Sequence, residues 1–157
     1  MTKSVIQPTV DTFVSTSWYR VLYVDTDNMQ IVNNSHYFRF FEQARNEHLR
    51  QLKMPYSEVE KRGIRTPLTE TGAHFYSSFH YDDLIRIESW ISQVKRASFR
   101  FEYFLYLDDS PNVKVTGFTV HATLAEDLKV VKIPDWLRDI ISPSLGPAQR
   151  KYLNVGP

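Results

Sequence analysis

One stretch of the chain has the apolar spacing of an amphipathic helix. Between residues 36 and 53, apolar side chains recur three and four positions apart, and charged or amide side chains fill the other positions. Asn34 or Ser35 can cap the start, and Pro55 limits continuation at the end. The spacing predicts a helix of about 25 Å from His36 to Lys53. Its apolar face consists of Tyr37, Phe40, Phe41, Ala44, His48, Leu49 and Leu52.

In most of the remaining chain, apolar and polar side chains alternate with a period of two, which is typical of β-strands. The predicted strands cover residues 18–24, 73–81, 84–94, 98–107, 113–124 and 129–133. The apolar phase slips at Gly117, which predicts a bulge there. One or two helical turns are expected within residues 56–63, and a short helix over 136–141.

The order of these elements predicts the fold class. Strands in series with short connections pair antiparallel, and a sheet with one apolar face covers a single long amphipathic helix. We therefore expect an α+β fold in which an antiparallel sheet of five to six strands wraps around one central helix. Residues 1–157 are the length of one domain, with a core over about 13–141 and loose ends at 1–12 and 143–157.

Composition narrows the possible chemistry. The chain has no cysteine, which excludes disulfides, thiolate zinc sites and cysteine nucleophiles. Its 19 Lys and Arg against 18 Asp and Glu leave no bulk basic surface for nucleic acid. The five histidines lack metal-ligand spacing, so no metal site is predicted. Without a signal peptide or an apolar run of membrane length, the expected location is cytoplasmic, with no membrane span.

Two adjoining segments carry a family signature. Residues 23–37 read YVDTDNMQIVNNSHY, and residues 38–45 read FRFFEQAR. This block resembles the signature of hotdog-fold acyl-CoA thioesterases of the 4-hydroxybenzoyl-CoA thioesterase type, and a looser likeness extends over about 17–137. The resemblance implies a hotdog fold and hydrolysis of acyl-CoA to free acid and CoA. No cofactor is implied, because CoA is part of the substrate.

The resemblance also assigns the catalytic groups. Thioester hydrolysis needs an attacking oxygen and donors for the oxyanion that forms, and a carboxylate can act as nucleophile or general base. The family's acid corresponds to Asp27, whereas Asp25 is expected to fix the turn. The first N–H groups of a helix lack internal partners and lie at its positive end. The carbonyl-polarising N–H accordingly corresponds to that of Asn34 or a neighbour.

Three further residues are expected at the substrate. Gln30 stands where the family usually has Gly, three residues after the acid. Either the turn differs there, or the Gln30 amide points into the pocket. Asn33 is a capping or turn residue that also borders the pocket, and Tyr37 is a core residue that also lines it.

A basic turn between two predicted strands is the expected site of the CoA phosphates. Lys95 and Arg96, followed by Ser98, resemble the family's basic cluster at that position. Phosphates favour Arg and Lys. The same patch, extended by Arg100, would equally suit an acidic acyl carrier protein, so the carrier of the acyl group stays open.

Other functions remain as alternatives. A hydro-lyase would use an Asp–His pair, and His36 lies near the helix start, but its spacing from Asp27 does not match that class. A non-catalytic acyl binder is suggested by Gln30. Glu42 could be a second acid, although a pairing with Arg45 or Arg39, each three residues away, is favoured.

The resemblance finally implies a homodimer or homotetramer, with sites at the subunit boundary. The chain itself offers a reason, because its strand aromatics exceed what one helix can cover. These residues are Phe75, Tyr76, Phe79, Phe104 and Tyr106.

Overall fold

The computed structural model describes residues 5–142. Its elements in chain order are β1 (Ser15–Arg20), the 3-10 helix η1 (Tyr23–Asp25), α1 (His36–Gln51), α2 (Tyr56–Lys61), β2 (Leu68–Phe75), β3 (Leu84–Val94), β4 (Ser98–Leu107), β5 (Val113–Ala122) and α3 (Asp135–Ile141). Within residues 5–142, no helix has the length and apolar character needed to cross a bilayer.

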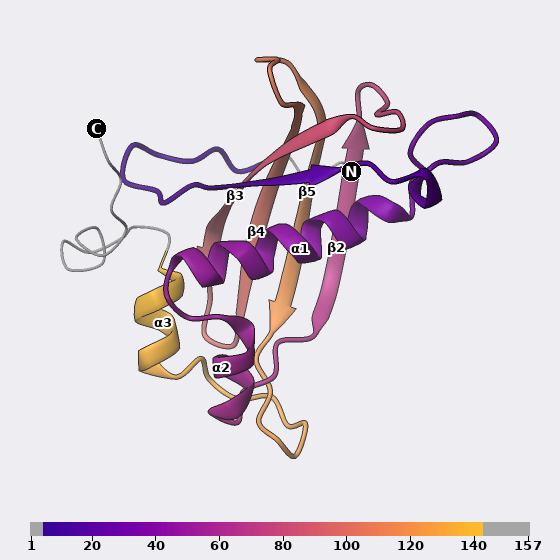
Figure 1. Cartoon of the computed structure of the whole chain (residues 1–157). Coiled ribbons are helices and arrows are strands. Elements are labelled where there is room, and N and C mark those ends of the chain that lie inside the picture. The colour runs from indigo at the N-terminus through magenta and orange to yellow at the C-terminus, as the bar shows by residue number, and fades with distance from the viewer. Residues whose placement is uncertain (1–4, 143–157) are drawn as a thin grey trace.

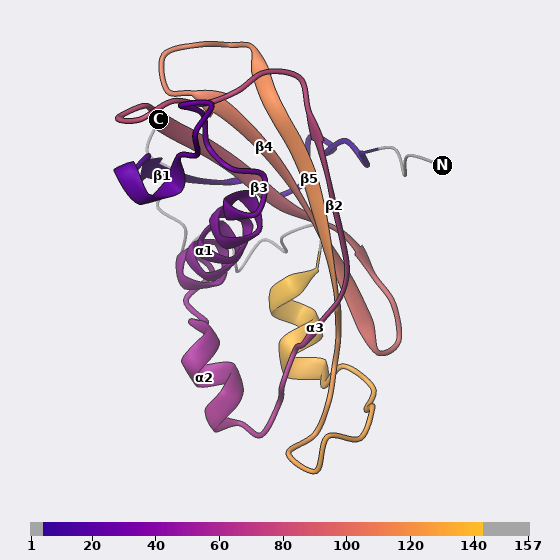
Figure 2. The same cartoon turned by 90° about the vertical axis from the view of Figure 1, so that its right-hand side faces the viewer.

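The five strands form one antiparallel sheet in the order β1-β3-β4-β5-β2. The sheet curves around α1, while α2 and α3 lie towards one end of the molecule (Figures 1 and 2). The prediction of an antiparallel sheet around one central helix is therefore confirmed, with five strands. The predicted loose end at 143–157 lies outside the described residues, as do residues 1–4. Of the predicted loose end at 1–12, Ile6 is attached to the sheet, because the Trp90 indole donates to the Ile6 carbonyl at 2.9 Å, whereas Val10 is fully exposed.

The helix begins at His36 as predicted and ends two residues before the predicted Lys53. Lys53 has a φ of 61°. Its N–H donates to the Arg50 carbonyl, and the Met54 N–H donates to the Leu49 carbonyl. This is the Schellman arrangement, with lysine at the left-handed position that glycine usually occupies. The turn ends α1 and directs the chain into α2.

Two of the predicted strands are displaced along the chain. The first strand is β1, Ser15–Arg20, and not 18–24, because the chain turns into η1 and leaves Leu22, Tyr23 and Val24 49%, 79% and 69% exposed. The strand predicted over 73–81 is β2, Leu68–Phe75. Both displaced strands lie at the edges of the sheet, where one side of the strand lacks a partner and the apolar alternation is weak.

The sixth predicted strand is wrong. In place of a strand over 129–133 the structure has an isolated bridge between Leu124 and Val130. Val130 is 68% exposed, whereas Ile133 is fully buried. The segment therefore reaches the core through Ile133 and does not extend the sheet.

The predicted bulge at Gly117 is also wrong. Gly117 pairs in register with Tyr103, and the shift between β4 and β5 falls between Leu105 and Tyr106. The glycine instead makes room for the helix, because a Cβ there would lie 2.2 Å from the Phe41 ring. That ring stacks on Tyr103 with 4.6 Å between centroids. Gly117 thus allows α1 to approach the sheet closely.

Two histidines are buried in the core and held neutral. The Nδ1 atom of His48 lies 2.8 Å from the Ser15 hydroxyl. His121 donates from Nδ1 to the Thr66 carbonyl at 3.1 Å and accepts at Nε2 from Arg45 at 3.2 Å. Burial lowers the pKa of each imidazole to about 3, and the Arg45 charge adds to the effect at His121. Protonation of either ring therefore opposes folding.

Gly117→Ala tests the close approach of α1. The added methyl must displace the Phe41 ring, so we expect the free energy of unfolding to fall by about 2–3 kcal/mol. Urea denaturation measures the change. Phe41→Leu in the same background should recover part of the loss, because it removes the clashing ring atoms. A Gly117→Ala protein of unchanged stability would contradict the packing described.

The buried histidines predict loss of stability in acid. Because their folded pKa values lie below the unfolded value of about 6.5, the unfolded state binds more protons as pH falls from 6.5 towards 3. We expect about 2–4 kcal/mol less stability at pH 5 than at pH 7.5, measured by urea denaturation at each pH. His121→Gln keeps a donor and an acceptor but does not titrate, and should reduce this difference by about half. An unchanged pH dependence in that variant would contradict the assignment.

Candidate active site

A tight hairpin follows η1 and carries Asp27. The Gln30 N–H donates to the Asp27 carbonyl at 2.8 Å, and the Asp27 N–H donates to the Ile31 carbonyl at 3.0 Å. Thr26 and Val32 form the bridge that closes the hairpin. Gln30 has a φ of 62°, the left-handed conformation that this three-residue loop requires and that glycine adopts most easily. The turn therefore keeps the backbone conformation that glycine would favour at this position, although the residue is Gln30.

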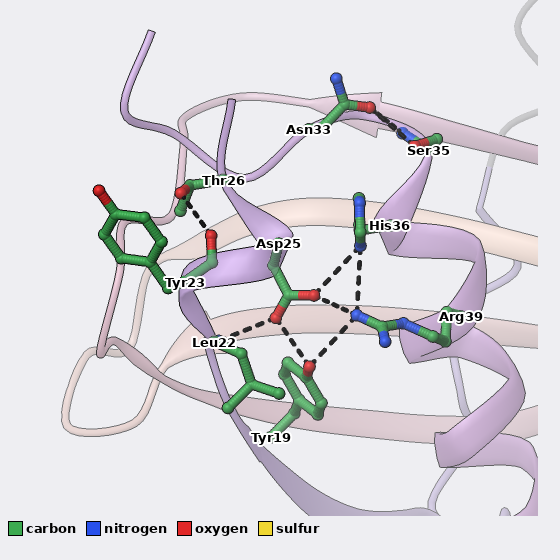
Figure 3. A network of polar contacts seen from close by, with 9 residues as sticks. All are labelled: Tyr19, Leu22, Tyr23, Asp25, Thr26, Asn33, Ser35, His36 and Arg39. Atoms are coloured by element: carbon green, nitrogen blue, oxygen red, sulfur yellow. Dashed lines mark hydrogen bonds and ion pairs between the residues drawn. The ribbon is translucent and has the colours of Figure 1, made fainter. Parts of the chain in front are cut away.

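Asp25 lies two residues before Asp27 and is fully buried. Its Oδ2 accepts hydrogen bonds from the Tyr19 hydroxyl at 2.7 Å and from the Leu22 N–H at 2.8 Å. Its Oδ1 pairs with the Arg39 guanidinium and lies 3.1 Å from His36 Nδ1 (Figure 3). Both oxygens are therefore occupied by groups from β1, η1 and α1.

The electrostatics of this network keep Asp25 ionised. Burial alone would raise the pKa of the carboxyl, but the Tyr19 and Leu22 hydrogen bonds and the Arg39 and His36 charges outweigh it, so the pKa lies below its ordinary value. Burial and the neighbouring carboxylate raise the pKa of Tyr19 to about 12. Asp25 is thus a paired structural anion, as expected for the residue that fixes the turn.

Asp27 has a different environment. Its Oδ1 accepts the Met29 N–H at 2.8 Å, and its Oδ2 accepts no hydrogen bond from the described residues. The side chain lines an open cavity of about 650 Å³. The other lining residues are Tyr23, Thr26, Asn28, Gln30, His80 and Tyr81. One carboxylate oxygen is therefore available to a ligand, and Gln30 lies at the same cavity.

The start of α1 lies beside this hairpin. Ser35, one of the two expected residues, is the N-cap, but its side chain makes no capping hydrogen bond. Instead the Asn33 Oδ1 accepts the Ser35 N–H at 3.0 Å and the Ser35 hydroxyl at 2.8 Å. The Asn33 N–H donates to the Asp25 carbonyl, and the His36 N–H to the Asn33 carbonyl. Within the described chain this leaves the Asn34 N–H without a partner. It is the donor that sequence reasoning placed at the substrate carbonyl.

Tyr37 is a core residue. It is 2% exposed, and its ring packs against Phe40 and Phe75 with centroids 5.6 and 4.9 Å away. Burial raises the pKa of its phenol to about 12. Tyr37 is not among the residues that line the Asp27 cavity. Its ring contacts instead anchor the first turn of α1 in the core.

The basic turn lies elsewhere in the chain. Asp27 lies near the start of β3, whereas Lys95 and Arg96 follow its end, and a strand of 11 residues spans roughly 33 Å. Lys95 and Ser98 line a separate cavity of about 220 Å³, to which Arg96 does not contribute. One chain therefore brings Asp27, Gln30 and the start of α1 together and leaves the basic turn apart.

Comparison with known proteins decides the family. Residues 21–141 match the family model described as the thioesterase-like superfamily. The chain belongs to the thioesterase-like superfamily. The expected thioester hydrolase class is thereby confirmed, together with the hotdog resemblance.

Several known proteins are moderately similar in sequence to this chain. An Aquifex aeolicus protein named as a candidate esterase is 30% identical over 78% of this chain and 93% of its own length. The acyl-CoA thioesterase YbgC of Haemophilus influenzae is 33% identical over 53% of this chain and 62% of its own length. The solved DHNA-CoA thioesterase of Staphylococcus aureus is 25% identical, with a TM-score of 0.74 over 80% of this chain and 87% of that one.

Three residues that line the Asp27 cavity were not predicted from the sequence. They are His80, Tyr23 and Tyr81. His80 reaches the cavity through its bridge to Ile31, a pairing of distant segments that no local motif marks. Within residues 5–142, no group of three or more metal-ligating side chains is placed to hold a metal ion.

Replacing Gln30 tests the backbone of the hairpin. We expect Gln30→Gly to raise the free energy of unfolding by about 0.5–1 kcal/mol. Glycine removes the steric cost of the left-handed conformation, and its larger loss of conformational entropy on folding offsets only part of that gain. Urea denaturation measures this. Asn28→Gly in the same loop, at a position without positive φ, should lower stability. A loss of stability in Gln30→Gly would contradict the turn.

Proposed function

We propose that this thioesterase hydrolyses acyl-CoA, with Asp27 as the nucleophile or as the base that activates water. The observation that carries the proposal is the contrast between two neighbouring carboxylates. Asp25 is buried and has both oxygens paired, whereas Asp27 lines the cavity with one oxygen unpaired among the described residues. Two relatives named for CoA thioesters, YbgC and the DHNA-CoA thioesterase, support the substrate class.

The start of α1 would stabilise the transition state. As Asp27, or water deprotonated by it, adds to the thioester carbon, negative charge grows on the carbonyl oxygen. The Asn34 N–H is available to receive that charge at the positive end of the helix dipole. The Asp25 network fixes the distance between the two groups, because Asp25 joins the hairpin to Asn33 and Arg39.

Binding of the CoA nucleotide requires a second copy of the chain in this proposal. Lys95, Arg96 and Ser98 lie roughly one strand length from Asp27, about 33 Å, within one chain. One edge of β2 pairs with no other strand of residues 5–142, and Leu68 and Phe75 on β2 are 50% and 41% exposed. Antiparallel pairing of two β2 strands would bring the partner's basic turn towards this chain's Asp27. We accordingly expect a homodimer or a higher oligomer built from it.

Thiol release from acyl-CoA tests the function. With short, long and aromatic acyl groups, we expect turnover by the wild type and a fall in kcat of about 10²–10⁴-fold in Asp27→Asn, because the amide is neither a base nor a nucleophile. The Asn side chain keeps an oxygen for the Met29 N–H, so the hairpin should survive. Because the chain has no cysteine, the thiol assay has no protein background.

Asp109→Asn is the matched control. Asp109 is an exposed carboxylate between β4 and β5 and does not line the cavity, so its replacement should leave kcat unchanged. Unchanged turnover in Asp27→Asn would contradict the assignment and direct attention to Glu42. A folded wild type that binds acyl-CoA and hydrolyses none would instead support an acyl-binding protein, and turnover confined to acyl carrier protein thioesters would identify that carrier.

A further inference from the structure

Asp27 and His80 face the same side of a small three-stranded arrangement. The Asp27 N–H donates to the Ile31 carbonyl, and Ile31 in turn bridges His80. Residues paired in this way project to the same face. The next pair, Val32 and Phe79, projects to the opposite face and is at most 1% exposed. The core therefore lies on one side, and Asp27 and His80 share the other.

The spacing leaves room for a substrate group between them. Neighbouring strands lie about 4.8 Å apart, so the backbones of Asp27 and His80 are roughly 10 Å apart, with Ile31 between. Both side chains line the cavity of about 650 Å³. A thioester group bound over Ile31 would have the carboxylate on one side and the imidazole on the other.

The turn at 80–83 orients His80. The His80 N–H donates to Asp83 Oδ2 at 2.8 Å, and the same oxygen lies 3.8 Å from Nδ1. This carboxylate occupies the Nδ1 side of the ring and leaves Nε2 available for a ligand. The imidazole is 62% exposed. The other nearby charges are Asp82, which faces Arg20, and Lys114, whose Nζ lies on the Phe79 ring.

The reaction must place a proton on the leaving sulfur, and His80 offers a donor on the side of Ile31 away from Asp27. When the C–S bond breaks, the electron pair goes to sulfur, and an alkyl thiol resembles cysteine with a pKa of about 8.5. Protonation of the leaving sulfur therefore assists cleavage near neutral pH. Asp27 is an acceptor in the addition step, whether it attacks or removes a proton from water. Histidine is the side chain that most often transfers protons in general acid–base catalysis, so an imidazole is suited to donate.

We propose that His80 is the catalytic acid that protonates the leaving sulfur, an inference that rests on the proposed role of Asp27. Water loses a proton to Asp27 and forms the new C–O bond. The C–S bond then breaks, and the proton on His80 Nε2 passes to sulfur. Asp27 returns its proton to solvent, and His80 regains one from solvent. The balance is one thioester and one water giving one acid and one thiol.

Two substrates with the same acyl group test this role. One is acyl-CoA, and the other is the acyl thioester of 4-nitrothiophenol, whose acidic thiol leaves without protonation. We expect His80→Gln to lower kcat/KM on acyl-CoA by about 10²-fold and on the aryl thioester by roughly threefold or less. The alkaline limb of the acyl-CoA pH profile should disappear, and added imidazole should restore part of the rate.

Asp82→Asn is the matched control, because it removes a charge from the same turn and keeps the imidazole. Asp82 has a φ of 67°, which asparagine tolerates, so both substrates should react as with the wild type. Equal loss on both substrates in His80→Gln would show a structural or binding role and overturn the proposal, as would no loss on either. In Asp27→Asn, activity on both substrates must be lost. If it is not, the proposed function fails, while the two-substrate comparison still decides the role of His80.

Discussion

A buried carboxylate organises the region where the sheet meets the helix. Asp25 is fully buried, and an ionised carboxylate without partners would be very costly there, so each of its oxygens must be satisfied. Its partners are Tyr19 on β1, Leu22 just before η1, and Arg39 on α1. Removing one of these partners leaves a buried carboxylate oxygen unsatisfied, which typically costs about 1–3 kcal/mol. The end of β1 and the start of α1 are therefore held in one geometry.

That constraint gives the two carboxylates different properties although they are only two residues apart. The chain bends through η1, so Asp25 points into the network and Asp27 into the cavity. Pairing lowers the pKa of Asp25 and leaves it no free oxygen. Among residues 5–142, the Asp27 carboxylate accepts a hydrogen bond from the Met29 N–H alone, and it is open to a ligand. Environment, and not residue type, separates the structural acid from the candidate catalytic one.

The sequence predicted the elements that have a strong and continuous pattern. The helix starting at His36 and the strands over 84–94 and 98–107 agree with the structure, because each buries a regular face. The first strand was misplaced because Leu22, Tyr23 and Val24 are apolar yet exposed. A short apolar run does not reveal which of its residues the sheet will cover. The apolar pattern shifts at Gly117 because the Phe41 ring on α1 packs against this position, and not because the strand bulges.

The site shows the same difference between features that a local pattern marks and features that depend on the folded chain. Asp27, Gln30, Asn33 and Asn34 lie within one short block, so a local signature could place them together. His80 joins them through a single bridge to the far side of the hairpin, and only the folded chain shows it. The basic turn was identified by its local charge, but its distance from Asp27 depends on the direction and length of β3. A local pattern therefore identifies the groups that carry out the chemistry, whereas the path of the strands decides which of them one substrate can contact.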